Sequence, residues 1–248
     1  MPPHSVPGPG NAGFASTQWS LVLAARDGGA PEAEAAMGAL CATYWRPLYA
    51  YVRRSGRSVE DAQDLTQSFF SHLLEKDGLQ HVEPARGKFR AFLLASLKNF
   101  ITNQWRHEHA AKRGGFARFL SVADLTRAED HYASEFTTPE SPERVYERNW
   151  ALTLLQRTMQ RLTDEFAAAG KSHVFELLRP QLTGDHDGAP YAEVAAALGM
   201  SEVAVRVTVH RMRGRFRDLL QQEVAQTLAD PGDARAIEEE MRYLLTVL

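Results

Sequence analysis

The residues of this chain that could do chemistry are mainly cations and amides, gathered in two stretches. Residues 86–118 hold eight Lys or Arg and one acid, and residues 203–217 hold five Arg and no acid. The rest of the chain is acidic, because the formal net charge is −3. Cations of this kind neutralise phosphates, and amides hydrogen-bond base edges. Two basic stretches on an acidic chain therefore predict contact with DNA at two places. The alternative is two solvated helix faces.

Residues that could carry catalysis show no matching arrangement. The chain has no GxxxxGK[ST] loop, no Gly-x-Ser-x-Gly and no His-Glu-x-x-His. His107 and His109 stand two apart, which is poor helical spacing for a shared metal ion. Asp185, His186 and Asp187 have no further ligand nearby in sequence, so they indicate a polar turn. We therefore expect a protein that is not an enzyme and uses no cofactor and no metal.

The single cysteine and the hydropathy pattern bear on the compartment. Cys41 has no partner for an intrachain disulfide, and it lies in an apolar run, so we expect a buried small hydrophobe rather than a reactive thiol. No apolar run approaches the ~20 residues that a membrane helix needs. Residues 1–13 lack the basic and apolar parts of a signal peptide. These features favour a cytoplasmic protein with no membrane contact.

The elements that position these residues are expected to be helices. Hydrophobic residues make up 44% of the chain, strand-like alternation is missing, and good helix formers dominate, so we predict an all-α fold of two small helical domains. The expected helices cover about 32–54, 58–76, 88–111 and 234–247, besides those of the second domain. The expected segments are a flexible tail (1–13), a first domain (14–113), a linker (114–142), a second domain (143–229) and a C-terminal extension (230–248).

The segment from Tyr191 to Arg213 has the pattern of a DNA-binding helix-turn-helix. Gly199 stands where a tight turn needs a positive φ, and Ser201 can cap the second helix. Apolar residues then repeat at helical spacing and form a buried stripe: Val205, Val209, Met212 and Phe216. A helical hairpin with a solvated basic side is the alternative. Together with the cap Ser201, the outward face predicted to contact DNA comprises Glu202, Arg206, Thr208, His210, Arg211 and Arg213.

This segment resembles region 4 of sigma-70 family RNA polymerase sigma factors of the extracytoplasmic-function class. The matching residues are Tyr191, Glu193, Val194, Ala195, Leu198, Gly199, Met200 and Ser201, followed by His210, Arg211, Met212 and Arg213. The resemblance implies that the second helix reads the −35 element of a promoter. The family often has Ser-Arg where this chain has Val207 and Thr208, so its base preference does not carry over.

The stretch from Asp61 to Leu74 predicts an amphipathic helix with an acidic, amide-bearing outer face. On pattern alone that face could merely meet water. The stretch resembles the Asp-Ala-Glu-Asp-hydrophobic-Thr-Gln signature of sigma region 2, with Gln63 in place of the usual Glu. In the family this helix docks on the coiled-coil clamp of the largest polymerase subunit. The resemblance implies that role for Asp61, Asp64, Leu65, Gln67 and Phe70.

The next helix carries its aromatic residues on a core face and its amides and cations on the other. Such a polar face suits a melted, single-stranded segment of DNA. The stretch resembles the family's −10 recognition and promoter-melting region. The residues expected to contact DNA here are Lys98, Asn99, Thr102, Asn103, Arg106, Lys112 and Arg113.

Both resemblances occur in the family's order along the chain. They imply a sigma factor that binds core RNA polymerase through the clamp and directs initiation at −10 and −35 promoter elements. An inhibitory anti-sigma factor is a further partner that the sequence leaves open. The alternative is a stand-alone helix-turn-helix regulator. Residues 230–248 are expected either to cap the core of the second domain or to restrain its binding to DNA.

Overall fold

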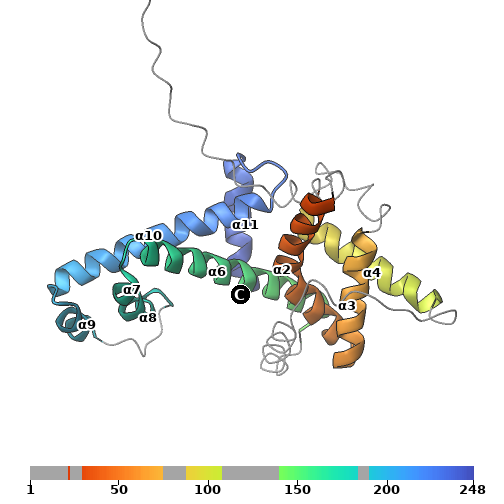
Figure 1. The fold of residues 1–248 in the computed structure, drawn as a ribbon, viewed down its shortest axis with the longest axis horizontal. Helices are drawn as coiled ribbons and strands as arrows, with labels where there is room; N and C mark the ends of the chain where they lie inside the picture. Colours follow the sequence, from red (N-terminus) through yellow and green to blue (C-terminus); the bar gives the residue numbers. More distant parts are fainter. Residues whose placement is uncertain (1–21, 23–29, 75–87, 108–139, 184–189) are drawn as a thin grey trace, which may run out of the picture.

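The computed structural model describes residues 22, 30–74, 88–107, 140–183 and 190–248 of the chain. Within these ranges every regular element is an α-helix, which confirms the predicted all-α class. The expected tail (1–13) and almost all of the expected linker (114–142) lie outside the described residues. Figure 1 shows the helices spread along one long axis, with α9 near one end and α4 near the other.

The first three described helices follow the predicted pattern closely. Helix α2 spans Ala30–Arg54, α3 spans Val59–Leu74 and α4 spans Phe89–His107. Gly56 has φ +88° and so permits the turn between α2 and α3. At the start of α3 the backbone N–H of Asp61 donates to Ser58 Oγ at 3.0 Å, which satisfies one of the amides that a helix start leaves unpaired.

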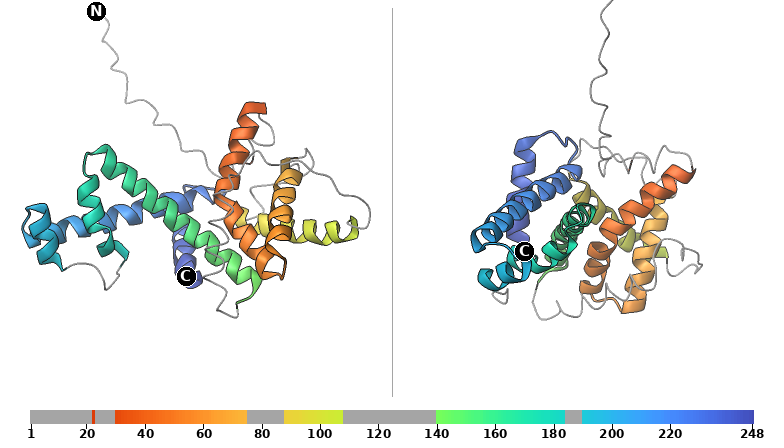
Figure 2. Two further views of the ribbon diagram at one scale, coloured as in Figure 1. Left: turned by 60° about the horizontal axis from the view of Figure 1, so that its bottom comes forward. Right: turned by 60° about the vertical axis from the view of Figure 1, so that its left-hand side comes forward.

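A single long helix then crosses the molecule. Helix α6 spans Pro142–Ala168, and Ser141 caps it by accepting from the N–H of Arg144 at 3.2 Å. Twenty-seven residues at 1.5 Å rise give a rod of about 40 Å. This rod packs against α2 near its start and against α10 along its later turns, as the views in Figures 1 and 2 agree.

The remaining helices are shorter than α6, and of these only α10 comes close to its length. They are α7 (Ser172–Leu178), α8 (Pro180–Thr183), α9 (Tyr191–Leu198), the long α10 (Glu202–Gln226) and α11 (Ala234–Val247). The expected C-terminal helix over 234–247 is thereby confirmed. The polar turn that the sequence predicts at Asp185, His186 and Asp187 lies outside the described residues.

Two large hydrophobic clusters form most of the described core, and α6 and α10 contribute to both. The first cluster joins α2, α3 and α4 to the first half of α6, the last turns of α10 and α11; among its members are Tyr44, Leu48, Phe69, Phe89, Leu93, Trp150, Leu154, Val224 and Leu244. The second joins the end of α6 to α7, α9 and the start of α10; among its members are Leu162, Phe175, Leu178, Val194, Val205, Val209 and Met212. The boundary expected near residue 143 is therefore the start of a helix, and the hydrophobic packing runs across it. The division into domains 14–113 and 143–229 stays a prediction.

Helix α11 belongs to the first of these clusters. Asp233 Oδ1 caps it by accepting from the N–H groups of Arg235 and Ala236, both at 3.0 Å. Leu244 and Val247 are buried in the same cluster as the N-terminal helices. The C-terminal segment thus caps a core, but that core includes residues of α2, α3 and α4, and not only those of the second predicted domain. Its regulatory role stays a prediction.

Cys41 behaves as its sequence context predicts. Only 3% of the residue is exposed, and burial raises the pKa of its thiol to about 12. The thiol is therefore protonated at neutral pH, and the interpretation as a small core hydrophobe is confirmed.

Two kinds of feature are absent from the part of the chain that the structure describes. None of the described helices combines the length and the hydropathy that crossing a bilayer requires. No group of three or more His, Cys, Asp or Glu side chains among the described residues is placed to hold a metal ion. The pair His107 and His109 and the triplet from Asp185 to Asp187, weighed above as ligands, have no described side chains.

Candidate nucleic-acid interface

The turn between α9 and α10 has the geometry that the sequence predicts. Gly199 lies in the left-handed region (φ 63°, ψ 31°), where a side chain would be strained, and it ends α9. The N–H of Met200 donates to the carbonyl of Ala195 at 3.0 Å. Ser201 Oγ accepts from the N–H of Ala204 at 3.2 Å and caps α10. Three residues thus make a tight turn between two helices, as in a helix-turn-helix.

The packing of α10 determines which of its faces is free. Val205, Val209 and Met212 are each at most 2% exposed, and they share the second cluster with Val194 of α9 and Phe175 of α7. This confirms the predicted buried stripe, with Phe216 partly buried at its end. Because α9 and α7 cover that side, the opposite side of the first turns of α10 faces outward.

Most residues predicted to contact DNA from this element lie on that outward side. Exposed among them are Ser201, Glu202, Arg206, His210, Arg211 and Arg213. Thr208 differs, because it is half-buried and its hydroxyl donates to the carbonyl of Ala204 at 2.8 Å. That hydrogen bond turns the hydroxyl toward its own helix.

Two of the exposed arginines are held by neighbours. Arg206 forms an ion pair with Glu202 at 2.5 Å, and its guanidinium lies 5.7 Å from the ring centre of Tyr191. Arg213 donates to the backbone carbonyl of Gln181 at 2.6 Å. Among the described residues Arg211 has no carboxylate within ion-pair distance. Its charge is therefore available on this face.

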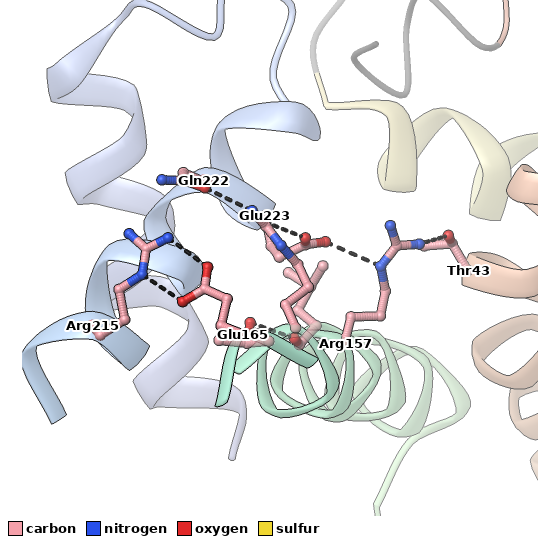
Figure 3. Close-up of polar contacts among 9 residues, drawn as sticks. Thr43, Arg157, Glu165, Arg215, Gln222 and Glu223 are labelled. Carbon is pink, nitrogen blue, oxygen red and sulfur yellow. Dashed lines mark hydrogen bonds and ion pairs between the residues drawn. The ribbon is translucent and has the colours of Figure 1, made fainter. Parts of the chain in front are cut away.

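Arg215 has a structural partner that the sequence did not reveal. Its Nε and Nη2 donate to the two carboxylate oxygens of Glu165 at 2.8 and 2.6 Å, a bidentate pair between α10 and α6 (Figure 3). The hydrogen bond from Arg215 holds the pKa of the Glu165 carboxyl below its usual value. Arg215 therefore joins two helices, and the cation count of residues 203–217 overstates the charge that is free for a ligand.

A buried carboxylate further along α10 makes a second link to α6. Glu223 is 2% exposed and accepts from Arg157 at 3.0 Å and from Arg161 at 2.8 Å (Figure 3). Arg157 also donates to Thr43 Oγ1 on α2, so the three helices meet at one polar point. The sequence does contain a signal for this, because Glu223 follows Leu219 by four residues and so continues the buried stripe of α10.

The candidate melting face lies on α4. Asn99, Thr102 and Asn103 are exposed, while Lys98 is half-exposed. On the predicted core side Phe89 is buried, while Phe92 and Phe100 are partly buried against the first cluster. The hydroxyl of Thr102 donates to the carbonyl of Lys98 at 2.8 Å. The side chain of Arg106, and the whole of Lys112 and Arg113, lie outside the described residues.

Lys98 is already engaged by another part of the chain. Its Nζ lies 2.6 Å from Glu143 Oε1 on α6 and 5.7 Å from the ring centre of Tyr51. The hydrogen bond from Lys98 lowers the pKa of Glu143, and the same bond raises the pKa of Lys98. The start of α6 therefore shields one of the cations expected to meet DNA.

Arg90, at the start of α4, is neutralised more completely. It is 4% exposed, and it donates to Glu240 of α11 at 2.5 Å and to Glu147 of α6 at 2.9 Å. Its guanidinium lies 4.2 Å from the ring centre of Trp150 and 4.7 Å from that of Tyr243. Burial alone would lower the pKa of Arg90, but the carboxylates of Glu240 and Glu147 outweigh it and raise that pKa.

Lys88 completes this buried cluster by an ion pair with Glu240, which is itself only 1% exposed. Two cations of the basic stretch 86–118 thus serve to hold α4 against α6 and α11. Arg90 is buried and not available to phosphates, whereas the side chain of Lys88 stays 45% exposed. No local pattern in the sequence indicates either pairing, because the partners stand far away in the chain.

The residues predicted to dock on a polymerase divide into two groups. Asp61 and Asp64 are exposed on α3, and Gln67 is half-exposed. Leu65 and Phe70 are 8% and 2% exposed and belong to the first hydrophobic cluster. Phe70 stacks on Trp45 of α2 with ring centres 6.0 Å apart. Only the first group is placed to touch another protein directly.

The two candidate DNA-contacting regions are well separated. Figure 1 shows α9 with the start of α10 near one end of the molecule and α4 near the other, and the left view of Figure 2 agrees. Helix α6 runs between them and contacts α2 as well as α10. The helix-turn-helix and the amide-bearing face therefore stand at opposite ends of a common frame.

Comparison with known proteins finds a family match for the part of the chain that contains the candidate melting face. Residues 40–111, which contain α3, α4 and most of α2, match the family model for sigma-70 region 2. A curated relative then narrows the class. Over 182 residues the chain is 27% identical to the ECF RNA polymerase sigma factor SigE of Mycolicibacterium smegmatis.

These two findings support an RNA polymerase sigma factor of the sigma-70 family, in the extracytoplasmic-function class, as the sequence motifs indicated. The aligned region covers 73% of this chain and 60% of the relative, so the chain spans well under the full length of that protein. No solved structure matches the chain significantly.

Proposed function

We propose that this protein is a sigma factor that binds core RNA polymerase and directs transcription initiation at specific promoters. The observation that carries the proposal is the presence, in one chain, of a sigma-70 region 2 match and a helix-turn-helix with an outward, basic face. Bond-making chemistry belongs in this proposal to the polymerase core, and the chain itself is not an enzyme.

In this proposal the outward face of α10 binds the −35 element in the major groove. Arg211 is the principal phosphate contact, since its charge has no carboxylate partner within the described residues. The Glu202–Arg206 pair stands at the start of the helix, where a recognition helix reaches base edges. Arg213 gives up a backbone hydrogen bond to Gln181 if it turns toward DNA.

The polar face of α4 binds the −10 element and the single DNA strand that melting exposes. Asn99 and Asn103 offer amides to unpaired base edges, and Thr102 lies between them on the exposed side. Lys98 leaves its ion pair with Glu143 and pairs instead with a phosphate of the strand. Arg106, Lys112 and Arg113 extend this role beyond the described side chains.

The carboxylates of α3 supply the contact with the clamp of the largest polymerase subunit. Asp61, Asp64 and Gln67 present that contact, while Leu65 and Phe70 fix the helix from the core side. This assignment separates contact residues from positioning residues. It predicts that substitutions of the contact residues lower affinity for the polymerase, whereas substitutions of the positioning residues lower the stability of the fold.

Reconstitution tests the proposal directly. The full chain with core polymerase should start RNA synthesis at a small number of genomic sites where core polymerase alone does not. Specific binding of the protein alone to a palindromic duplex, with no effect on the polymerase, would instead identify a stand-alone regulator.

Substitutions in α3 test the docking surface. Asp64→Ala and Gln67→Ala should lower affinity for core polymerase while leaving the thermal unfolding midpoint unchanged, because both side chains reach solvent. Glu176→Ala, at an exposed carboxylate on α7, is the matched control. Unchanged core binding in both α3 variants would remove the docking assignment.

A further inference from the structure

Two valines on the outward face of α10 are exposed although aliphatic residues are usually inside. Val203 is 71% exposed and Val207 is 44% exposed. They stand four residues apart and so lie next to each other on the helix surface. The buried stripe of the same helix runs through Val205, Val209 and Met212, so neither exposed valine has a role in the core.

Along this face of α10 the exposed apolar residues come first and the exposed basic residues follow. The apolar pair lies in the first two turns, next to the capped helix start at Ser201. His210 and Arg211, three and four residues after Val207, continue the same face and are exposed. A recognition helix has this order, with base-edge contacts near its start and phosphate contacts later.

The polar groups near the helix start are less free than their types suggest. Thr208 donates its hydroxyl to the carbonyl of Ala204, and Glu202 is paired with Arg206. Val203 and Val207 are thus the unengaged side chains in these turns. An aliphatic side chain cannot read a pattern of hydrogen-bond donors and acceptors. In the major groove the apolar feature of a base edge is the C5 methyl group of thymine.

We infer that Val203 and Val207 contact thymine methyl groups in the major groove, so that the sequence read by α10 contains thymine opposite Val207. The inference rests on the proposed function, because it requires that α10 binds duplex DNA. The occupant is DNA, and not an apolar protein surface, since residues 203–217 carry no acid and Arg211 adjoins the valines.

The probe for the test is a duplex selected from a randomised library by the full chain in complex with core polymerase. Each thymine of the selected site is replaced in turn by deoxyuridine, which lacks only the C5 methyl group. Loss of one buried methyl contact should weaken binding about fourfold, the ratio expected for one apolar carbon returned to water.

Variants connect that effect to the two side chains. In Val207→Ala the sensitive position should become insensitive to deoxyuridine, and in Val203→Ala a neighbouring position should do so. Alanine favours helix more than valine does and both sites are exposed, so the fold should be kept. Leu245→Ala removes another exposed aliphatic chain, on α11, and should leave every position as sensitive as before.

The outcomes separate this inference from the proposed function. If the complex selects no DNA site, the proposed function fails. If it selects a site but no thymine is sensitive to methyl removal, or if sensitivity persists when Val203 and Val207 are both alanine, only the methyl contacts are disproved. Sensitivity that vanishes with the valines supports the inference.

Discussion

Arginines occur in two contrasting settings in this molecule, on the outward face of α10 and in the buried cluster around α11. Arg211 is exposed and has no carboxylate partner among the described residues. Arg90 is 4% exposed and meets Glu240, Glu147 and two aromatic rings. The same residue type thus either holds helices together or remains available to an external anion. Count and spacing in the sequence do not distinguish these settings; the position of the carboxylates in the folded chain does.

The largest expected effect comes from removing the carboxylate of Glu240. Glu240→Ala leaves Arg90 buried without its 2.5 Å partner, and breaking a buried pair in this way costs about 3–5 kcal/mol of unfolding free energy. Urea denaturation of the full chain measures it. Glu239→Ala is the control, because that side chain is exposed and pairs with Arg235 within one helix, which is worth below about 0.5 kcal/mol. Equal losses of unfolding free energy in both variants would mean that the buried pair stabilises the fold no more than the exposed pair does.

A smaller loss is expected at the second buried carboxylate. Glu223→Ala removes the acceptor shared by Arg157 and Arg161, which are each more than a third exposed and can regain water. We therefore expect a loss of about 1–3 kcal/mol, below that of Glu240→Ala. The same denaturation experiment decides the order. A larger loss than for Glu240→Ala would show that the exposure of the arginine partners does not determine how much unfolding free energy is lost.

Next comes a pair of arginines on α10 that stand four residues apart. Arg211→Ala should weaken binding of the selected duplex by the reconstituted complex and reduce the salt dependence of log K by about one ion, without changing stability. Arg215→Ala should change the salt dependence less and cost at most about 1 kcal/mol of stability, since it breaks the half-exposed pair with Glu165. Titration of binding against salt compares them. Equal slopes would mean that Arg215 leaves Glu165 to bind phosphate.

The smallest effect is a pH dependence from the surface pairs. The folded-state pKa values of Glu143 and Glu165 are lowered by Lys98 and Arg215. Their contribution is therefore present above the ordinary pKa of glutamate, near 4.3, and is lost as the pH falls through the lowered values. Solvent screening limits each to a few tenths of a kcal/mol. Glu143→Gln should flatten the acid limb of the stability curve by that amount, and an unchanged limb would contradict the Lys98 pairing.

Helical periodicity predicted most of the fold. The spacing of Val205, Val209 and Met212 fixed the buried side of α10, and Gly199 with Ser201 fixed its turn, because these signals depend only on near neighbours. The same reasoning placed the amides of α4 outside.

Long-range contacts were beyond such reasoning. The pairs of Lys98 with Glu143 and of Arg90 with Glu240 depend on how distant helices pack, and no local pattern encodes that. Leu65 and Phe70 came from a family motif that does not separate surface from core positions. The predicted outward face of α10 did not include Val203, although this residue stands off the buried stripe and is 71% exposed.

The contact between Arg90 and Glu240 has a consequence for the order of folding during synthesis. The two residues are 150 positions apart, so at about 5–20 residues per second Arg90 leaves the ribosome's catalytic centre roughly 8–30 s before its main counter-charge exists. Until then Glu147 is the one carboxylate of this cluster that can pair with Arg90. The N-terminal helices of this protein therefore reach their final packing only after the last described helix has been translated.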